Sequence, residues 1–197
     1  MDKELTVKSS ITINATAAKV WDALTNPEQT KKYMFGCETV SDWKAGSPLL
    51  WQANYEGKDT VFVKGNIVRI EPEKFLAYTT FDPNSTIEDI PANYLTVTYD
   101  LSAKDGQTLL TVTQGDYSKV ADSERRYTEA YNGGEGWNPI LVEIRDSQMG
   151  MIMDVKQHDI ADHVAGDQSQ AIKNDGRCLK RISTQQRSWK RNKTDTQ

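Results

Sequence analysis

The sequence predicts an α+β domain in which a curved antiparallel sheet of about six to seven strands wraps a long C-terminal helix. Short segments with an apolar residue at every second position follow one another between residues 5 and 117, and turn residues separate them, which is typical of antiparallel strands. Two short amphipathic segments follow the first strand. Finally, the i, i+3, i+4, i+7 spacing of one apolar helix face is present at Trp137, Ile140, Leu141 and Ile144. The sheet can pack against this face.

The chain starts with a strand and two short helices. Residues 5–13 alternate apolar and polar side chains, which predicts a strand with one buried face. Residues 17–24 carry apolar side chains at helical spacing. Asn26-Pro27-Glu28 then supplies a capping side chain, a proline for the first turn and an acid near the helix N-terminus, so we expect a second helix that ends at Gly36.

The middle of the chain consists of strands and turns. Gly65-Asn66 interrupts one strand and predicts a β-bulge there. A polar loop occupies residues 82–91, and Lys104-Asp105-Gly106-Gln107 is a strong hairpin signal. We therefore predict strands over residues 41–43, 49–55, 60–63, 75–81 and 95–101, and one more that contains Leu110 and Val112.

The long helix begins near Gly136. Gly133-Gly134 ends any earlier helix, and Pro139 is tolerated only in a first turn. Met151 and Val155 would continue the same apolar face beyond the first half of the helix.

Charge and aromatic content divide the chain near residue 148. Residues 1–148 hold 15 Lys and Arg against 22 Asp and Glu, a balance of −7, whereas residues 149–197 hold 9 against 6, a balance of +3. Sixteen of the 17 aromatic residues lie in the first part. We predict a folded domain over residues 1–148 and an extension over residues 149–197 that continues the helix and then becomes disordered.

Several classes of protein are disfavoured. The charged N-terminus shows no secretory segment, and no run approaches the roughly 20 apolar residues of a membrane span, so we expect a cytoplasmic protein without a membrane partner. One cysteine in each part disfavours a disulfide framework. The acidic first part argues against nucleic acid as a partner of the domain.

The sequence offers little for catalysis. The first 148 residues contain no histidine, which removes the commonest general base and most zinc sites, and no glycine-rich phosphate loop is present. We therefore predict no cofactor and no metal. The groups left for acid–base chemistry are carboxylates, which we interpret as turn and loop residues, and tyrosines: Glu56, Asp59, Glu88, Asp89, Asp116, Tyr78, Tyr94 and Tyr99.

Residues 149–197 show two polar features. His158 and His163 stand near two aspartates, but their spacing of five suits a metal site on a helix poorly. Residues 177–193 are basic, which allows contact with anionic partners and is equally typical of a solvated tail.

Four local patterns resemble one protein family. They are residues 13–25 (INATAAKVWDALT), 26–28 (NPE), 64–76 (KGNIVRIEPEKFL) and 135–137 (EGW). Together with the order of elements, they make residues 5–148 similar to the START/Bet-v-like (SRPBCC) superfamily, in the group named after the C-terminal domain of the heat-shock-protein-90 ATPase activator. The resemblance implies a helix-grip fold with an internal pocket, in a superfamily that includes lipid and hormone binders, polyketide cyclases and uncharacterised bacterial members.

Two departures from the family pattern bear on function. The separate N-terminal domain of the eukaryotic activator, with its Asn-Asn-Trp-His-Trp motif, has no counterpart in the sequence, which weighs against stimulation of a chaperone ATPase. Residues 149–197 match nothing expected of the family.

The resemblance also places a set of aromatic residues around the pocket. Aromatic rings with polar groups suit a mostly apolar small-molecule site, although core packing can explain any one of them. Cys37 would lie near the mouth, where we expect a buried structural thiol. The candidate ligand-binding residues are Tyr33, Phe35, Trp43, Trp51, Phe62, Tyr78, Tyr94, Tyr99, Trp137 and Leu141.

Three hypotheses for function remain, in a monomer or a homodimer. The first is binding of a small hydrophobic or amphipathic ligand between the sheet and the C-terminal helix. The second is a co-chaperone or other protein-binding module that acts through the outer face of the sheet. The third is a cofactor-free enzyme of the cyclase or hydrolase kind, which the absence of histidine disfavours and which requires a buried carboxylate with a raised pKa.

Overall fold

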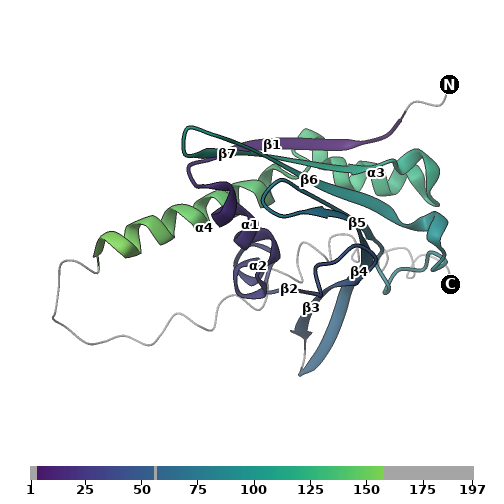
Figure 1. The fold of residues 1–197 in the computed structure, drawn as a ribbon. Helices are drawn as coiled ribbons and strands as arrows, with labels where there is room; N and C mark the ends of the chain where they lie inside the picture. The colour runs from purple at the N-terminus through teal and green to yellow at the C-terminus, as the bar shows by residue number, and fades with distance from the viewer. Residues whose placement is uncertain (1–3, 56, 158–197) are drawn as a thin grey trace.

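A computed structural model describes residues 4–55 and 57–157, in which one antiparallel sheet carries helices on one side (Figure 1). The strands are β1 (Val7–Ile13), β2 (Glu38–Ser41), β3 (Pro48–Tyr55), β4 (Lys58–Glu71), β5 (Phe75–Thr80), β6 (Leu95–Lys104) and β7 (Gln107–Gly115). The α-helices are α1 (Ala17–Thr25), α2 (Pro27–Tyr33), α3 (Ser123–Tyr131) and α4 (Asn138–Gln157), and the short 3-10 helices are η1 (Pro91–Asn93), η2 (Tyr117–Lys119) and η3 (Asn132–Gly134).

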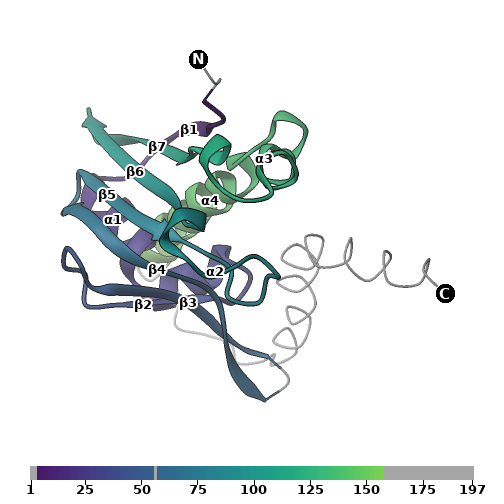
Figure 2. The same ribbon diagram turned by 90° about the vertical axis from the view of Figure 1, so that its right-hand side faces the viewer.

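The seven described strands form one sheet in the order β1-β7-β6-β5-β4-β3-β2. Strands β2 to β7 follow one another as an antiparallel meander, and β1 adds to β7 at the far edge. Figure 2 shows this sheet as a curved layer, with α4 and α3 on the same side of it. The strand predicted within residues 5–13 is confirmed as β1, and so is the predicted α+β helix-grip architecture.

The two short helices are fixed by their caps. The Thr16 side chain accepts a hydrogen bond from the backbone N–H of Lys19 at the start of α1. The Asn26 side chain accepts one from the N–H of Glu28 at 3.0 Å, and Pro27 occupies the first turn of α2. These caps confirm the predicted helix starts.

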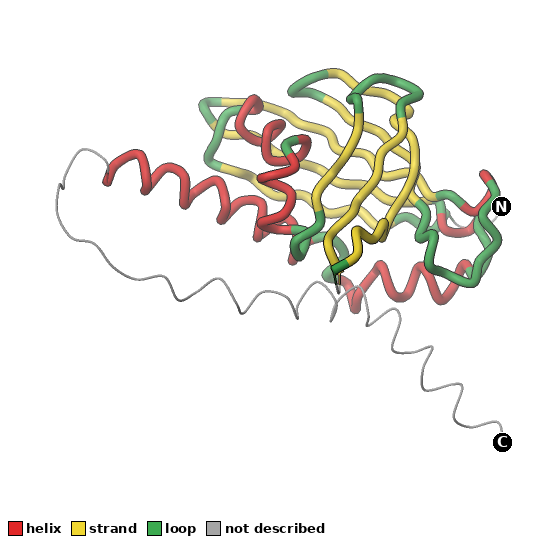
Figure 3. The backbone as a smooth tube through the Cα atoms, turned by 90° about the horizontal axis from the view of Figure 1, so that it is seen from below, coloured by secondary structure: helices red, strands yellow, loops and turns green. Residues whose placement is uncertain are grey.

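The core lies between the inner face of the sheet and the helices. Helix α4 packs against β1 and against α1 and α2. Leu141 and Ile144 are at most 1% exposed, and Trp137 and Ile140 pack against the same cluster, so the predicted apolar face of α4 is confirmed. Figure 3 shows that the C-terminal part of α4 continues past the sheet.

The predicted bulge at Gly65-Asn66 is wrong in position. The register of β4 shifts at Phe62 against β3 and at Val68 against β5, on either side of the glycine. Gly65 has a different role, because a Cβ on it would lie 1.6 Å from the carbonyl oxygen of Thr79. Glycine occupies this position because two backbones approach closely, not because the strand contains an extra residue.

The predicted strand over residues 41–43 is also corrected. Strand β2 ends at Ser41, whose hydroxyl accepts a hydrogen bond from the N–H of Trp43 at 3.2 Å. Trp43 has a φ of +53°, which extended strands do not adopt, so it belongs to the following turn. Helix α3 has no counterpart among the predicted elements, and it packs against η2 and β1.

Part of the predicted extension lies outside the described residues. Helix α4 is described to Gln157. Residues 158–197, with the two histidines, Cys178 and the basic segment 177–193, lie beyond it. No helix within residues 4–55 and 57–157 is long and apolar enough to cross a membrane.

Candidate functional site

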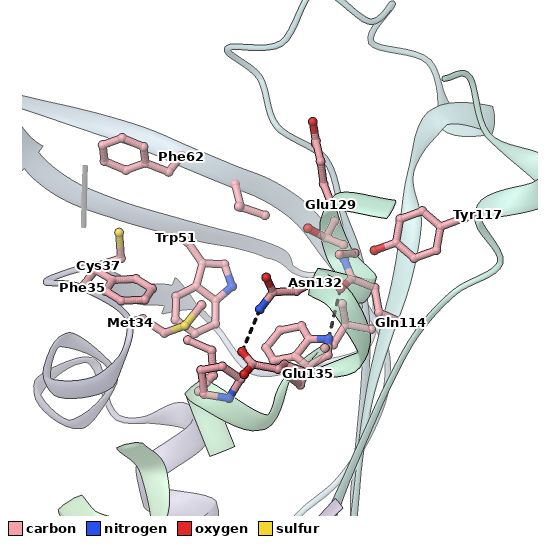
Figure 4. A pocket seen from close by; sticks show the side chains of 18 of the residues that line it. Met34, Phe35, Cys37, Trp51, Phe62, Gln114, Tyr117, Glu129, Asn132 and Glu135 are labelled. Atoms are coloured by element: carbon pink, nitrogen blue, oxygen red, sulfur yellow. Dashed lines mark hydrogen bonds between the residues drawn. The ribbon is translucent and has the colours of Figure 1, made fainter. Parts of the chain in front are cut away.

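A cavity of about 730 Å³ lies between the inner face of the sheet and the first turn of α4 (Figure 4). The loop after α2 closes one side with Met34, Phe35 and Cys37, and α3 and η3 close another. Strands β3 to β7 each contribute at least one side chain to its wall.

Half of the predicted ligand-binding residues line this cavity. They come from three strands, one loop and the start of α4: Phe35, Trp51, Phe62, Tyr78 and Trp137. Trp51 and Phe62 form a buried cluster with Cys37, against which Phe35 packs. Cys37 is only 2% exposed, which matches the expectation of a buried thiol near the pocket.

Three other predicted residues lie in the filled core. The Tyr33 hydroxyl donates a hydrogen bond to the carbonyl oxygen of Ala23 at 2.9 Å. The Tyr99 and Tyr78 hydroxyls share a hydrogen bond of 3.2 Å. Leu141 is completely buried. All three side chains are at most 2% exposed, and none of them lines the cavity.

The remaining two predicted residues lie away from the cavity. Trp43 packs against the main core from its turn before β3. Tyr94 stacks on Phe81 with ring centroids 5.0 Å apart, and its hydroxyl donates to Asp89 at 2.8 Å. Lys64 completes this cluster through an ion pair with Asp89.

Several residues of the wall were missed by the sequence analysis. Gln114 and Tyr117 follow one another around the end of β7, and Glu129, Asn132 and Glu135 belong to α3 and the segment that joins it to α4. One signal for α3 was available, since Tyr127 and Tyr131 stand four residues apart in a run without glycine or proline, and their rings stack at 5.6 Å. Nothing in the sequence distinguishes Gln114 from other polar strand residues.

The cavity carries a few convergent polar groups. The Trp137 indole N–H donates to the Gln114 carboxamide oxygen at 3.1 Å, which fixes the plane of the ring. The Tyr78 hydroxyl is held by Tyr99, and the Tyr117 hydroxyl points towards Gln114 in Figure 4. Burial raises the pKa of Tyr78 and Tyr117 well above the ordinary value and raises the pKa of Tyr99 to about 12. These hydroxyls are therefore protonated near neutral pH and serve as hydrogen-bonding groups, not as bases.

The carboxylates predicted for acid–base chemistry do not meet in the cavity. The Lys64 ammonium, followed by the Tyr94 hydroxyl, lowers the pKa of Asp89. The Ser118 hydroxyl, followed by the Leu5 backbone N–H, lowers the pKa of Asp116 to about 2. Asp59 is exposed near the start of β4, Glu88 is exposed in the loop between β5 and η1, and Glu56 lies outside the described residues. Within the described part of the chain, the carboxylates with a shifted pKa all shift downwards, opposite to the shift that a buried general acid requires.

Asp116 has a structural function at the edge of the cavity. Its Oδ1 accepts hydrogen bonds from the Leu5 N–H at 2.9 Å, the Ser118 N–H at 3.0 Å and the Ser118 hydroxyl at 2.7 Å. The carboxylate therefore ties the segment before β1 to η2, the turn that carries Tyr117.

Replacement of Asp116 by alanine should give a pH-dependent loss of stability. The folded pKa of about 2 lies below the ordinary 3.8, so the ionised carboxylate stabilises the fold fully above about pH 4 and progressively less as the pH falls towards 2. We expect Asp116→Ala to unfold at lower urea concentration than the unmodified protein at neutral pH, with a difference that shrinks in acid. Asp100→Ala, which removes an exposed carboxylate of β6, serves as control. A difference that does not change with pH would contradict this role.

The geometry defines the class of protein. A curved antiparallel sheet that wraps a long C-terminal helix, with two short helices after the first strand and a cavity beneath the sheet, is the helix-grip arrangement of the START/Bet-v-like superfamily. The family described as Activator of Hsp90 ATPase homolog 1-like protein matches residues 14–146, more than half of the chain. The chain belongs to this family.

Solved structures agree with the assignment. ChR145 from Cytophaga hutchinsonii is 31% identical over 78% of this chain and 99% of its own, with a TM-score of 0.60. CalU16 from Micromonospora echinospora is 21% identical over 78% and 82%, with a TM-score of 0.54. The Aha1 dimer from Colwellia psychrerythraea is 16% identical over 72% and 94%, with a TM-score of 0.52. The last two likenesses establish the fold alone. A search of curated proteins gives no match.

Proposed function

We propose that this protein binds a small hydrophobic or amphipathic ligand in the cavity between the sheet and the start of α4. The observation that carries the proposal is the cavity itself. Its volume of about 730 Å³ lies within the roughly 300–1,000 Å³ that is usual for small-molecule sites. Its wall is mainly aromatic and aliphatic, with the Gln114 carboxamide and two tyrosine hydroxyls as orienting groups.

The composition of the wall favours binding over catalysis. The tyrosine hydroxyls hold their protons, and the carboxylates with shifted pKa values are stabilised as anions by hydrogen bonds outside the cavity centre. Apolar burial against Trp51, Phe62 and Trp137 would supply the affinity, at about 25 cal/mol for each Å² of apolar surface removed from water.

Native mass spectrometry of freshly purified protein, compared with the denatured mass, tests the proposal. We expect an excess mass of a few hundred daltons, the size of a ligand that such a cavity accommodates, which disappears on denaturation. The neutral fluorescent probe N-phenyl-1-naphthylamine provides a second measurement. The probe should fluoresce in the presence of the protein, and this fluorescence should fall when the extracted ligand is added and displaces the probe. Absence of both the excess mass and probe binding would contradict the proposal.

A second function, stimulation of a chaperone ATPase, is favoured by the description of the family. Within residues 4–55 and 57–148, no single element presents a stripe of exposed large apolar side chains to a partner. These side chains come one each from seven separate segments: Val40, Tyr55, Val68, Ile90, Leu109, Tyr131 and Val142. An ATPase assay of heat-shock protein 90 with added protein separates the two proposals, because a ligand-binding protein should leave the rate unchanged.

A further inference from the structure

The charged side chains of the cavity wall are all acidic within the described part of the chain. They are Glu129 on α3 and Glu135 in the segment before α4, and no described lysine or arginine lines the cavity. Glu129 is neutralised, because its two oxygens accept hydrogen bonds from the Arg125 guanidinium at 3.0 and 3.1 Å. Glu135 differs, since its described partner is the neutral Asn132 amide at 3.3 Å (Figure 4). The wall therefore keeps one carboxylate without a described counter-ion.

An anionic ligand would find few partners in this cavity. The N-terminus of a helix ordinarily attracts anions through its unpaired N–H groups. Here the Trp137 N–H donates to the Ser9 hydroxyl at 3.2 Å, the Asn138 N–H donates to the Glu135 carbonyl oxygen at 2.9 Å, and Pro139 has no N–H. The backbone N–H groups of Trp137 and Asn138 thus already have partners within the protein, and a carboxylate or phosphate bound beside them would face Glu135.

The aromatic wall suits a cation. The faces of Trp and Tyr rings attract ammonium groups, and the attraction strengthens where water is excluded. Trp51 is 4% exposed, and the indole of Trp137 is held in one orientation by Gln114 on β7 and by edge-to-face packing against Tyr99 at 6.2 Å. Two indoles, one from the sheet and one from the start of α4, therefore line the same cavity as Glu135, an exposed carboxylate without a described counter-ion.

We infer that the ligand is a small amphipathic cation, an organic amine or quaternary ammonium compound with an apolar body. Its charged end is held at Glu135, and its apolar body packs against Trp51 and Trp137. This inference rests on the proposed function, since it specifies the chemical class that the same cavity selects.

A purely structural role for Glu135 makes a different prediction. An acidic residue close to the N-terminus of α4 also stabilises the helix dipole. In that case Glu135→Gln would lower the melting temperature and would leave the choice between cationic and anionic ligands unchanged. The ratio of the two affinities is therefore the readout that separates the roles.

Isothermal titration calorimetry with three probes that share one octyl chain tests the inference: octyltrimethylammonium, octanoate and 1-octanol, each below its micelle concentration. We expect octyltrimethylammonium to bind about tenfold more tightly than octanoate, the effect of one favourable charge or cation–π contact. Glu135→Gln should remove most of this preference. Glu143→Gln, which removes an equal charge from an exposed position on α4 outside the cavity wall, should retain it.

Three results would overturn the inference or its assignment to Glu135, and only one of them also contradicts the proposed function. If octanol binds but octanoate binds as tightly as octyltrimethylammonium, the cavity takes apolar ligands without the proposed selectivity. If none of the three probes binds, the result contradicts the proposed function as well. A preference for the cation that persists in Glu135→Gln would overturn the assignment of the charge to Glu135.

Discussion

Replacement of Gly65 by alanine should destabilise the fold by about 3 kcal/mol or more. A Cβ at this position would lie 1.6 Å from the carbonyl oxygen of Thr79 and 2.5 Å from its carbonyl carbon, and both atoms belong to the backbone of β5. The clash cannot be relieved by a side-chain rotation. Strands β4 and β5 would have to separate where Lys64 and Phe81 exchange backbone hydrogen bonds of 2.9 and 2.8 Å.

Gly115→Ala provides a comparison in which the added Cβ meets a milder clash. A Cβ on Gly115 would lie 2.8 Å from the hydroxyl oxygen of Thr6, which can rotate away, although the Leu5 carbonyl oxygen stands at 3.1 Å. Gly115→Ala should therefore cost less than Gly65→Ala in urea unfolding followed by circular dichroism. Equal stability of Gly65→Ala and the unmodified protein would show that the two strands are not held this closely. If Gly65→Ala yields no folded protein while Gly115→Ala does, the expectation is met.

The position of Gly65 links this packing to the cavity. Phe62 and Val63 of the wall precede it on β4, and Tyr78 and Thr80 flank Thr79 on β5. Because the two strands approach so closely at Gly65, their inward-facing side chains are brought onto one wall. The same contact that fixes the sheet therefore fixes part of the candidate site.

Local signals in the sequence predicted α1, α2, α4 and most strands, but α3 was missed. The caps at Thr16 and Asn26 and the proline at position 139 act within one turn of helix, so they can be recognised without tertiary information. The errors at Trp43 and Gly65, in contrast, could be avoided only with knowledge of distant partners. From the sequence alone, Trp43 is typical of a strand, and only the structure shows its left-handed backbone in the turn before β3. Likewise, Gly65 suggests a bulge, and only the structure shows that its neighbour is the Thr79 backbone.

The candidate site was predictable only in part for a similar reason. Alternation along a strand identifies the side chains that face inwards, but it does not show which part of the interior is filled. Tyr99 and Tyr78 are both buried and share a hydrogen bond, but only Tyr78 lines the cavity. Gln114 carries no distinguishing signal, since its role arises from a hydrogen bond to Trp137, 23 residues away along the chain.

Replacement of Phe35 by asparagine should weaken binding of N-phenyl-1-naphthylamine about tenfold with little change in stability. Phe35 lines the cavity from the α2–β2 loop and has a φ of +57°, a conformation that is rare for bulky side chains. Asparagine tolerates this conformation, so the substitution relieves a backbone cost of about 1 kcal/mol. The loss of ring packing against Trp51 and Cys37 offsets that gain. Backbone strain of this kind costs stability and is often retained at functional sites, so the left-handed conformation of Phe35 supports a role for its ring in binding.

Glu73→Asn is the matched control for this experiment. Glu73 has a φ of +63° and lies exposed in the turn between β4 and β5, outside the cavity wall. Its replacement should bring the same backbone relief, and so a stability gain of up to about 1 kcal/mol, without any effect on probe affinity. Fluorescence titration and thermal unfolding of both variants separate the two contributions. If Phe35→Asn binds the probe as tightly as Glu73→Asn does, the Phe35 ring takes no part in the site, and its left-handed backbone must be explained by the packing of the loop alone.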